Sequence, residues 1–104
     1  MVHAKKVLPE FFEPLRSGLK TFELRREEDN EPKYAVGDYL ALNEYDPEKQ
    51  RFTGRALVFR IRYRVDAEQS CGTLSPGCVA LGLGAVYFDS PGERGPAFYE
   101  CQQK

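Results

Sequence analysis

Residues 55–65 alternate between two kinds of side chain, and this pattern constrains the fold more than any other feature. The apolar set consists of Leu57, Phe59, Ile61, Tyr63 and Val65. The set between them consists of Val58, Arg60, Arg62 and Arg64. Successive residues of a strand point to opposite faces, so this alternation predicts a long β-strand with its apolar face buried.

The rest of the chain adds further strands and one early helix. Pro9 suits the first helical position and Gly18 a left-handed C-terminal cap, whereas Pro14 predicts a short, bent or two-piece helix. The predicted elements are strands at 3–8, 20–25, 39–45 and 78–84, a last short strand at 97–101, and a helix at 9–17. Five to six strands with one helix predict a mainly β (α+β) fold, built as a small, twisted, partly closed barrel.

Length and composition limit the classes of protein to consider. The 104 residues predict a single domain, residues 1–104, and 41% hydrophobic with 30% charged residues is typical of a soluble globular protein. No apolar run reaches the roughly 18–20 residues that span a membrane. The N-terminus lacks an apolar signal core, so we expect a cytoplasmic protein with no membrane partner. The net charge of −1 argues against strong non-specific attraction to nucleic acid, but a local basic stripe remains compatible with it.

Cysteine and histidine usage gives no metal pattern. Cys71, Cys78 and Cys101 include no C-x-x-C pair, and His3 is the only histidine. Zinc ligands occur in pairs at characteristic short spacings, which this chain lacks, so we expect no metal, no organic cofactor and reduced thiols.

The stretch 18–25 concentrates chemistry on one short segment. As a strand entered from a turn, it is expected to point Phe22 and Leu24 toward the core. The opposite face then carries Lys20 at the strand entrance, followed by Thr21, Glu23 and Arg25. An acid between two bases can hold a polar or anionic ligand, or it can be a solvated face with cross-strand ion pairs.

Several motifs follow one another in the order of a known family. They are a strand beginning at His3, Leu-Pro-x-Phe-Phe at 8–12, Gly-x-Lys-x-x-Glu-x-Arg at 18–25, and Val-Gly-Asp at 36–38. Together they resemble the ASCH domains of the PUA-like superfamily, and more narrowly the small bacterial and phage branch known as DUF3850. The resemblance covers about His3 to Gly84 and leaves residues 85–104 as a C-terminal extension.

The resemblance implies a pseudo-barrel with a cleft beside the Gly-x-Lys-x-x-Glu-x-Arg strand, which binds RNA or a nucleotide. Lys20 and Arg25 would meet phosphate or a base edge, and Glu23 would accept from an exocyclic amine. Tyr39 and Tyr45 are candidates to stack on an unpaired base. The candidate ligand-binding residues are His3, Lys20, Thr21, Glu23, Arg25, Asp38 and Tyr45.

The arginines of the alternating strand give a second candidate surface. Arg60, Arg62 and Arg64 are expected to form a basic row that follows a nucleic-acid backbone. The alternative is an exposed face whose arginines pair with the many acids of the chain.

Two other functions stay open. Some ASCH members resemble amidohydrolases of acylated cytidine, in which case Lys20 would act as base or nucleophile and Glu23 would orient it. Against this, the position where those enzymes carry a threonine holds Glu23 here, and a Lys20–Glu23 pair would keep the lysine unreactive. The third function is a protein-interaction adaptor that uses the acidic loop 27–31 and the tail 89–104.

Overall fold

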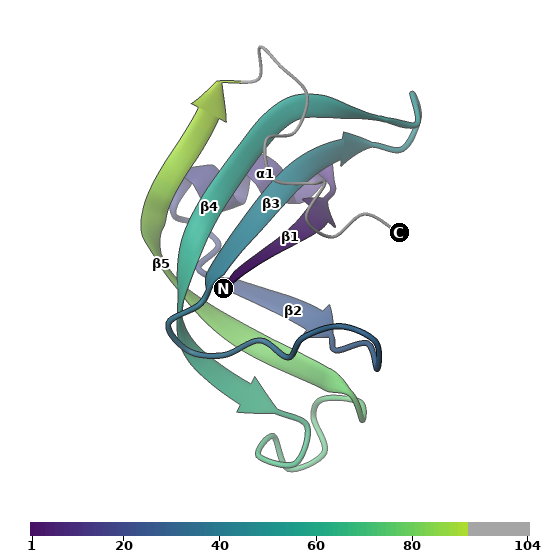
Figure 1. Cartoon of the computed structure of the whole chain (residues 1–104), viewed down its shortest axis with the longest axis vertical. Coiled ribbons are helices and arrows are strands. Elements are labelled where there is room, and N and C mark those ends of the chain that lie inside the picture. The colour runs from purple at the N-terminus through teal and green to yellow at the C-terminus, as the bar shows by residue number, and fades with distance from the viewer. Residues whose placement is uncertain (92–104) are drawn as a thin grey trace.

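The computed structural model describes residues 1–91 of the chain and shows a mainly β protein with one short N-terminal helix (Figure 1). This confirms the predicted fold class. The elements in chain order are β1 (Val2–Val7), α1 (Pro9–Ser17), β2 (Phe22–Arg26), β3 (Tyr39–Asp46), β4 (Arg51–Asp66) and β5 (Cys78–Pro91). The short strand expected at 97–101 lies outside the described residues.

The five strands form one sheet in the order β1-β3-β4-β5-β2. The β1–β3 pair is parallel and the other three pairs are antiparallel. Figure 1 shows the sheet curling into a half-barrel, so that its two edge strands, β1 and β2, approach each other on the open side. The curl therefore brings together two segments that are not hydrogen-bonded neighbours in the sheet.

Helix α1 lies against the inner face of the curled sheet. Its ends follow the sequence signals, because Pro9 occupies the first turn and Gly18 adopts φ +90°, with its N–H bonded to the Leu15 carbonyl at 3.3 Å. Pro14 lies inside the helix without dividing it into two pieces. Within residues 1–91, no helix has the length and apolar character that a membrane crossing requires.

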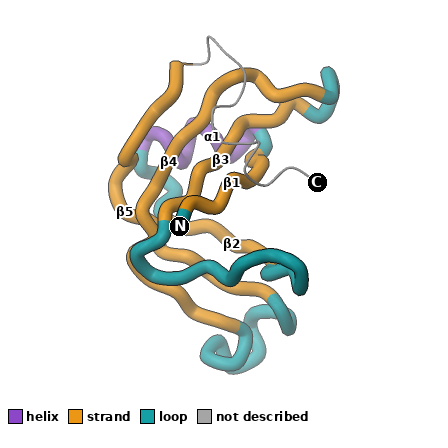
Figure 2. Tube along the Cα trace, viewed as in Figure 1, coloured by secondary structure: helices purple, strands orange, loops and turns teal. Residues whose placement is uncertain are grey.

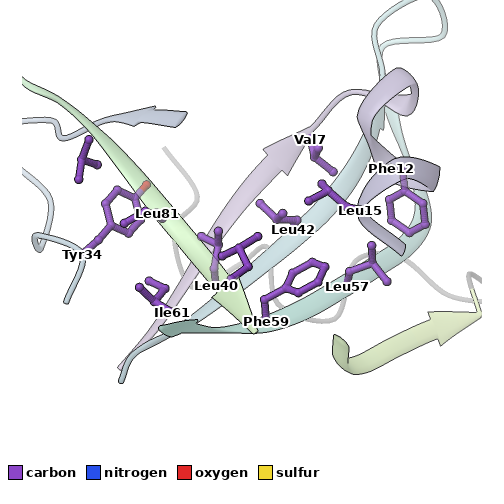
Figure 3. Close-up of a cluster of buried hydrophobic side chains, with 12 residues drawn as sticks. Val7, Phe12, Leu15, Tyr34, Leu40, Leu42, Leu57, Phe59, Ile61 and Leu81 are labelled. Atoms are coloured by element: carbon purple, nitrogen blue, oxygen red, sulfur yellow. The ribbon is translucent and has the colours of Figure 1, made fainter. Parts of the chain in front are cut away.

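The hydrophobic core fills the inner side of the half-barrel and includes the buried face of α1 (Figure 3). Apolar residues at alternate positions of β3 and β4 supply its centre, as the period-two pattern predicts. Its buried members are Val7, Phe12, Leu15, Tyr34, Leu40, Leu42, Leu57, Phe59, Ile61, Val79, Leu81 and Leu83.

The alternation of β4 changes partway along the strand, which corrects one prediction. The register between β4 and β5 shifts at three places between Val58 and Tyr63. Each extra residue at a bulge moves the following side chains to the other face. Ile61 is buried as expected, but Tyr63 is exposed rather than part of the core, and Arg64 turns toward the inside.

Strand β5 is longer than the 78–84 segment expected from the sequence. It continues to Pro91, and its last residues pair with β4 as far as Arg55. The segment beyond Gly84 ends in Asp89, Ser90 and Pro91, which give a weak strand signal, whereas pairing with the long neighbouring strand β4 extends β5.

Candidate functional site: a charged cluster between the sheet edges

The two edge strands are joined through one arginine. Arg25 of β2 donates from Nη2 to the main-chain oxygen of Lys6 on β1 at 2.6 Å. The same side chain donates from Nε to Glu23 Oε2 at 3.1 Å. Arg25 therefore closes the open side of the half-barrel and fixes Glu23 at this junction.

Glu23 is a buried carboxylate held by two cations. Its residue is only 6% exposed, and its Oε1 accepts from Lys20 Nζ at 2.7 Å. Lys20 also donates to the Phe22 carbonyl at 2.9 Å, and its ammonium lies 4.9 Å from the centre of the Phe22 ring. Lys20, Glu23 and Arg25 thus contact one another as an acid between two bases, and this cluster is partly withdrawn from solvent.

The orientation expected for β2 is wrong. Phe22 and Leu24 are 47% and 57% exposed, whereas Glu23 points inward. Residues of other elements complete the core. The inward-facing side of β2 meets β1 instead, where Arg25 bonds to the main-chain oxygen of Lys6. Thr21 is exposed and borders, with Lys20, a hollow of about 240 Å³ near the end of α1.

Tyr34, on the loop between β2 and β3, is buried in the core and lies next to residues of β1. Its ring centre lies 4.7 Å from that of His3 and 5.9 Å from the ammonium of Lys5. Burial raises the pKa of Tyr34 to about 12, with the nearby Arg25 opposing and Glu31 adding to the shift. The phenol is therefore protonated at neutral pH and can donate a hydrogen bond.

His3 and Asp38 form a pair next to Tyr34. The buried His3 Nε2 lies 2.8 Å from Asp38 Oδ2, and that carboxylate also accepts from the Ala35 N–H at 3.2 Å. Partial burial of Asp38 opposes its charge, but the hydrogen bonds from His3 and from the N-terminal ammonium outweigh burial and hold the pKa of Asp38 below its usual value. His3 and Asp38 thus hold the loop between β2 and β3 in place next to Tyr34.

The β2–β3 loop (residues 27–38) runs along the open side of the half-barrel (Figure 2). Two ion pairs, Glu27 with Arg64 and Glu31 with Lys5, and the hydrogen bond between Asp38 and His3 fix it. The acidic loop predicted at 27–31 is therefore held against β1 and β4 at two of its acids.

The expected row of three arginines does not form on one face. Arg60 and Arg62 are exposed, but Arg64 donates to both carboxylate oxygens of Glu27 and to the Tyr34 carbonyl. The β4 bulges separate Arg64 from the other two, because they shift the side-chain alternation. A nucleic-acid role for Arg60 and Arg62 stays a prediction.

Tyr45 packs against other residues than the Glu23 cluster. Its ring packs edge-on against Phe52 at 5.0 Å between centres, and the ammonium of Lys6 lies 4.3 Å above it. Lys6 follows Lys5 along β1 and so points to the other face of the sheet. The structure brings Lys20, Glu23 and Arg25 together, and it pairs His3 with Asp38, whereas Tyr45 packs with Phe52 and Lys6 instead.

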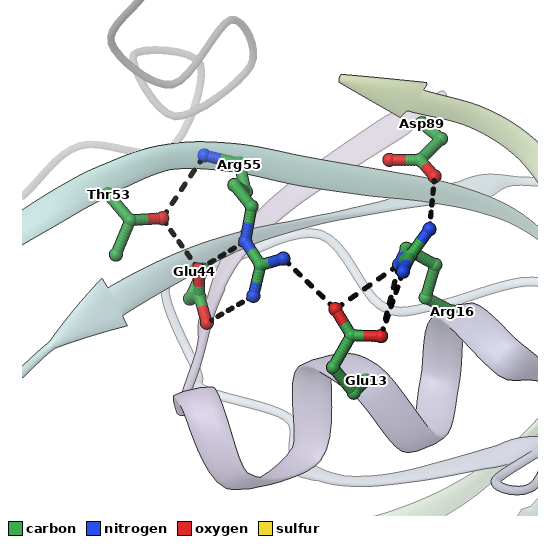
Figure 4. A network of polar contacts seen from close by, with 6 residues as sticks. All are labelled: Glu13, Arg16, Glu44, Thr53, Arg55 and Asp89. Atoms are coloured by element: carbon green, nitrogen blue, oxygen red, sulfur yellow. Dashed lines mark hydrogen bonds and ion pairs between the residues drawn. The ribbon is translucent and has the colours of Figure 1, made fainter. Parts of the chain in front are cut away.

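A second polar network, which the sequence did not reveal, lies where α1 meets the β3–β4 hairpin (Figure 4). The buried Glu44 accepts from Arg55 Nε at 2.8 Å and from Thr53 Oγ1 at 2.7 Å. Arg55 also donates to Glu13 of α1 at 3.0 Å, and Arg16 of the same helix approaches Asp89 of β5. This network ties the helix to the sheet, so we assign it a structural role.

The buried ion pairs predict a loss of stability in acid. Hydrogen bonds from Arg64 and Arg55 lower the pKa of Glu27 and Glu44, respectively, below the values of the unfolded chain. The stabilisation is complete above the unfolded pKa, about 4.3, and is lost as the pH falls through the lower folded values. We expect the free energy of unfolding, measured by urea titration, to fall steadily between about pH 5 and pH 3.

A variant isolates one of these carboxylates. Glu44→Gln is expected to be less stable at pH 7 and to lose less stability than the unmodified protein on acidification. Parallel pH profiles for the two proteins would show that Glu44 does not contribute.

Two cations and a carboxylate thus form a charged cluster at the joined edges of a small half-barrel. No three histidine, cysteine or acidic side chains within residues 1–91 come together in a way that suits a metal. A family model described as "Domain of unknown function (DUF3850)" matches residues 2–83, and the chain therefore belongs to this family. No curated protein matches the chain.

Proposed function

We propose that this protein is an ASCH-type member of the PUA-like superfamily that binds RNA or a nucleotide in the cleft between β1 and β2. The observation that carries the proposal is Glu23, buried between Lys20 and Arg25 where the two sheet edges meet. The same three side chains form the core of the Gly-x-Lys-x-x-Glu-x-Arg motif at 18–25.

The chemistry around this cluster suits a nucleotide. Lys5, Lys20 and Arg25 supply three cations against the carboxylates of Glu23 and Glu31, which favours an anion. Phosphate is the natural counterpart of such groups, because guanidinium and ammonium donate charge-assisted hydrogen bonds to its oxygens.

Aromatic side chains next to the cluster offer a surface for a base. Phe22 and Phe11 are partly exposed, and both rings lie close to the Lys20 ammonium. Stacking of unpaired bases on aromatic rings is sequence-tolerant and contributes about 1–3 kcal/mol per base. Phe22 and Phe11 replace Tyr39 and Tyr45 as the proposed stacking residues.

The cluster favours binding over amide hydrolysis. A lysine that attacks a carbonyl must present an uncharged nitrogen with a free lone pair. The Lys20 ammonium instead donates to Glu23 and to the Phe22 carbonyl. We therefore propose that Lys20 and Glu23 bind the ligand, and that an acylated nucleoside would be a ligand of this protein rather than a substrate.

Binding of a fluorescent single-stranded RNA, followed by anisotropy, tests the proposal. Lys20→Gln is expected to weaken binding by about tenfold or more, and to make the dependence on salt less steep because one phosphate contact is lost. Lys49→Gln is the matched control, because it removes one positive charge from the exposed β3–β4 turn. Equal losses in the two variants, or no RNA affinity in the unmodified protein, would contradict the proposal; the second result would favour a protein-interaction domain.

A further inference from the structure

We propose that Lys5 and Tyr34 form an anion-binding subsite of the cleft, that Glu31 of the protein's own acidic loop occupies it in the free state, and that a phosphate of the ligand displaces Glu31. This inference rests on the proposed function, because it assigns one part of the same cleft. It makes the β2–β3 loop a built-in competitor of the ligand.

The Lys5–Glu31 ion pair is withdrawn from solvent. The two side chains are only 16% and 17% exposed, and Lys5 Nζ donates to Glu31 Oε1. Lys5 lies on the inner face of β1, two residues from the buried His3. Glu31 reaches it from a loop segment without regular structure, held locally by a turn in which the Glu31 N–H bonds to the Glu28 carbonyl at 3.2 Å.

The position of this pair links it to the proposed ligand cleft. Arg25 of the Glu23 cluster bonds to the main-chain oxygen of Lys6, the residue next to Lys5, and the Lys5 ammonium lies 5.9 Å from the centre of the Tyr34 ring. A ligand bound at Lys20 and Arg25 therefore has a third cation, Lys5, close to the point where Arg25 meets β1. In the free protein the charge of Lys5 is already satisfied by Glu31.

A phosphate has the chemistry to replace this carboxylate. The terminal phosphate of a nucleotide is a monoester that carries about −1.5 to −2 charge at pH 7 and three acceptor oxygens, whereas a carboxylate carries one charge and two oxygens. The released Glu31 returns to water on a loop whose neighbours Glu28, Asp29 and Asn30 are exposed. The exchange keeps Lys5 paired, so it avoids the cost of leaving a partly buried ammonium without a partner.

The inference predicts that removing the competitor strengthens binding. Glu31→Gln keeps a polar side chain of the same size but removes its charge, so an external anion meets an unpaired Lys5. Inorganic phosphate is titrated into labelled protein at low ionic strength, and binding is followed by two-dimensional NMR. We expect phosphate to bind to Glu31→Gln about tenfold more tightly than to the unmodified protein. The shifts should centre on Lys5 and Tyr34.

Asp29→Asn is the matched control, because it makes the same charge change on the same loop at an exposed position. We expect this variant to change phosphate affinity by no more than about twofold. The double variant Glu31→Gln/Lys5→Gln should lose the gain, which assigns the effect to Lys5. Circular dichroism spectra check that each variant is folded.

The outcomes separate this inference from the proposed function. If Glu31→Gln binds phosphate no more tightly than Asp29→Asn while RNA still binds through Lys20, the subsite is wrong and the proposed function stands. If neither RNA nor phosphate binds to the unmodified protein or to Glu31→Gln, both are wrong. A gain that survives the loss of Lys5 also overturns the subsite.

Discussion

Glu23→Ala is expected to lower the free energy of unfolding by about 2–4 kcal/mol. The substitution leaves Lys20 and Arg25 without the carboxylate that both now contact, at side chains that are largely withdrawn from water. Unpaired charges at such positions are costly, whereas the net contribution of the intact cluster is smaller. For a domain of this size the melting temperature should fall by about 10–20 °C.

Urea denaturation measures this loss, and two variants make it specific. Glu48→Ala removes a carboxylate from the exposed β3–β4 turn and should change the stability by less than about 0.5 kcal/mol. Glu23→Gln keeps the shape and one acceptor, so its loss should be intermediate. A Glu23→Ala protein as stable as the Glu48→Ala control would show that the cluster does not hold the sheet edges together.

Leu15→Ala is expected to have an effect of similar size through the core. Leu15 lies on the buried face of α1 and packs in the central cluster with Phe12 (Figure 3). Loss of buried methyl groups and the cavity left behind cost about 2–5 kcal/mol for a leucine-to-alanine change. The packing of α1 against the sheet should weaken as well, because Leu15 and Phe12 are the two buried residues of α1.

Leu19→Ala provides the control for this change four residues further along the chain. Leu19 is exposed, and the same atoms are removed, so the stability should stay within about 0.5 kcal/mol of the unmodified protein. Thermal unfolding followed by circular dichroism distinguishes the two variants. Equal stability of the Leu15→Ala and Leu19→Ala proteins would contradict the assignment of α1 to the core.

Elements with a strong local signal could be predicted from the sequence. The helix bounds follow from Pro9 and Gly18, whose backbone preferences act on the residue itself. Strand β3 follows from its apolar run, and most of β4 from its alternation, because period-two patterns report directly on which face is buried. Local chemistry therefore determined the class of fold and most element positions.

Features that depend on tertiary pairing were not predictable. The orientation of β2 was inferred from its apolar residues, but its inner face is set by Arg25, which bonds to a carbonyl on β1. Tyr63 is exposed because bulges form where β4 bends around β5, and no local pattern marks them. Lys5, Glu31 and Tyr34 come from separate segments that meet only in the folded chain, so no local pattern marks their contact.

Mapping of bound RNA by two-dimensional NMR tests the central claim most directly. Labelled protein is titrated with a short single-stranded RNA, then with cytidine and an acylated cytidine. The account predicts that shifts of backbone amides cluster at Lys20, Thr21, Glu23 and Arg25, and extend to Lys5 and Tyr34 across the joined edges. Shifts confined to the exposed Arg60 and Arg62, or no shifts with any of these ligands, would contradict it.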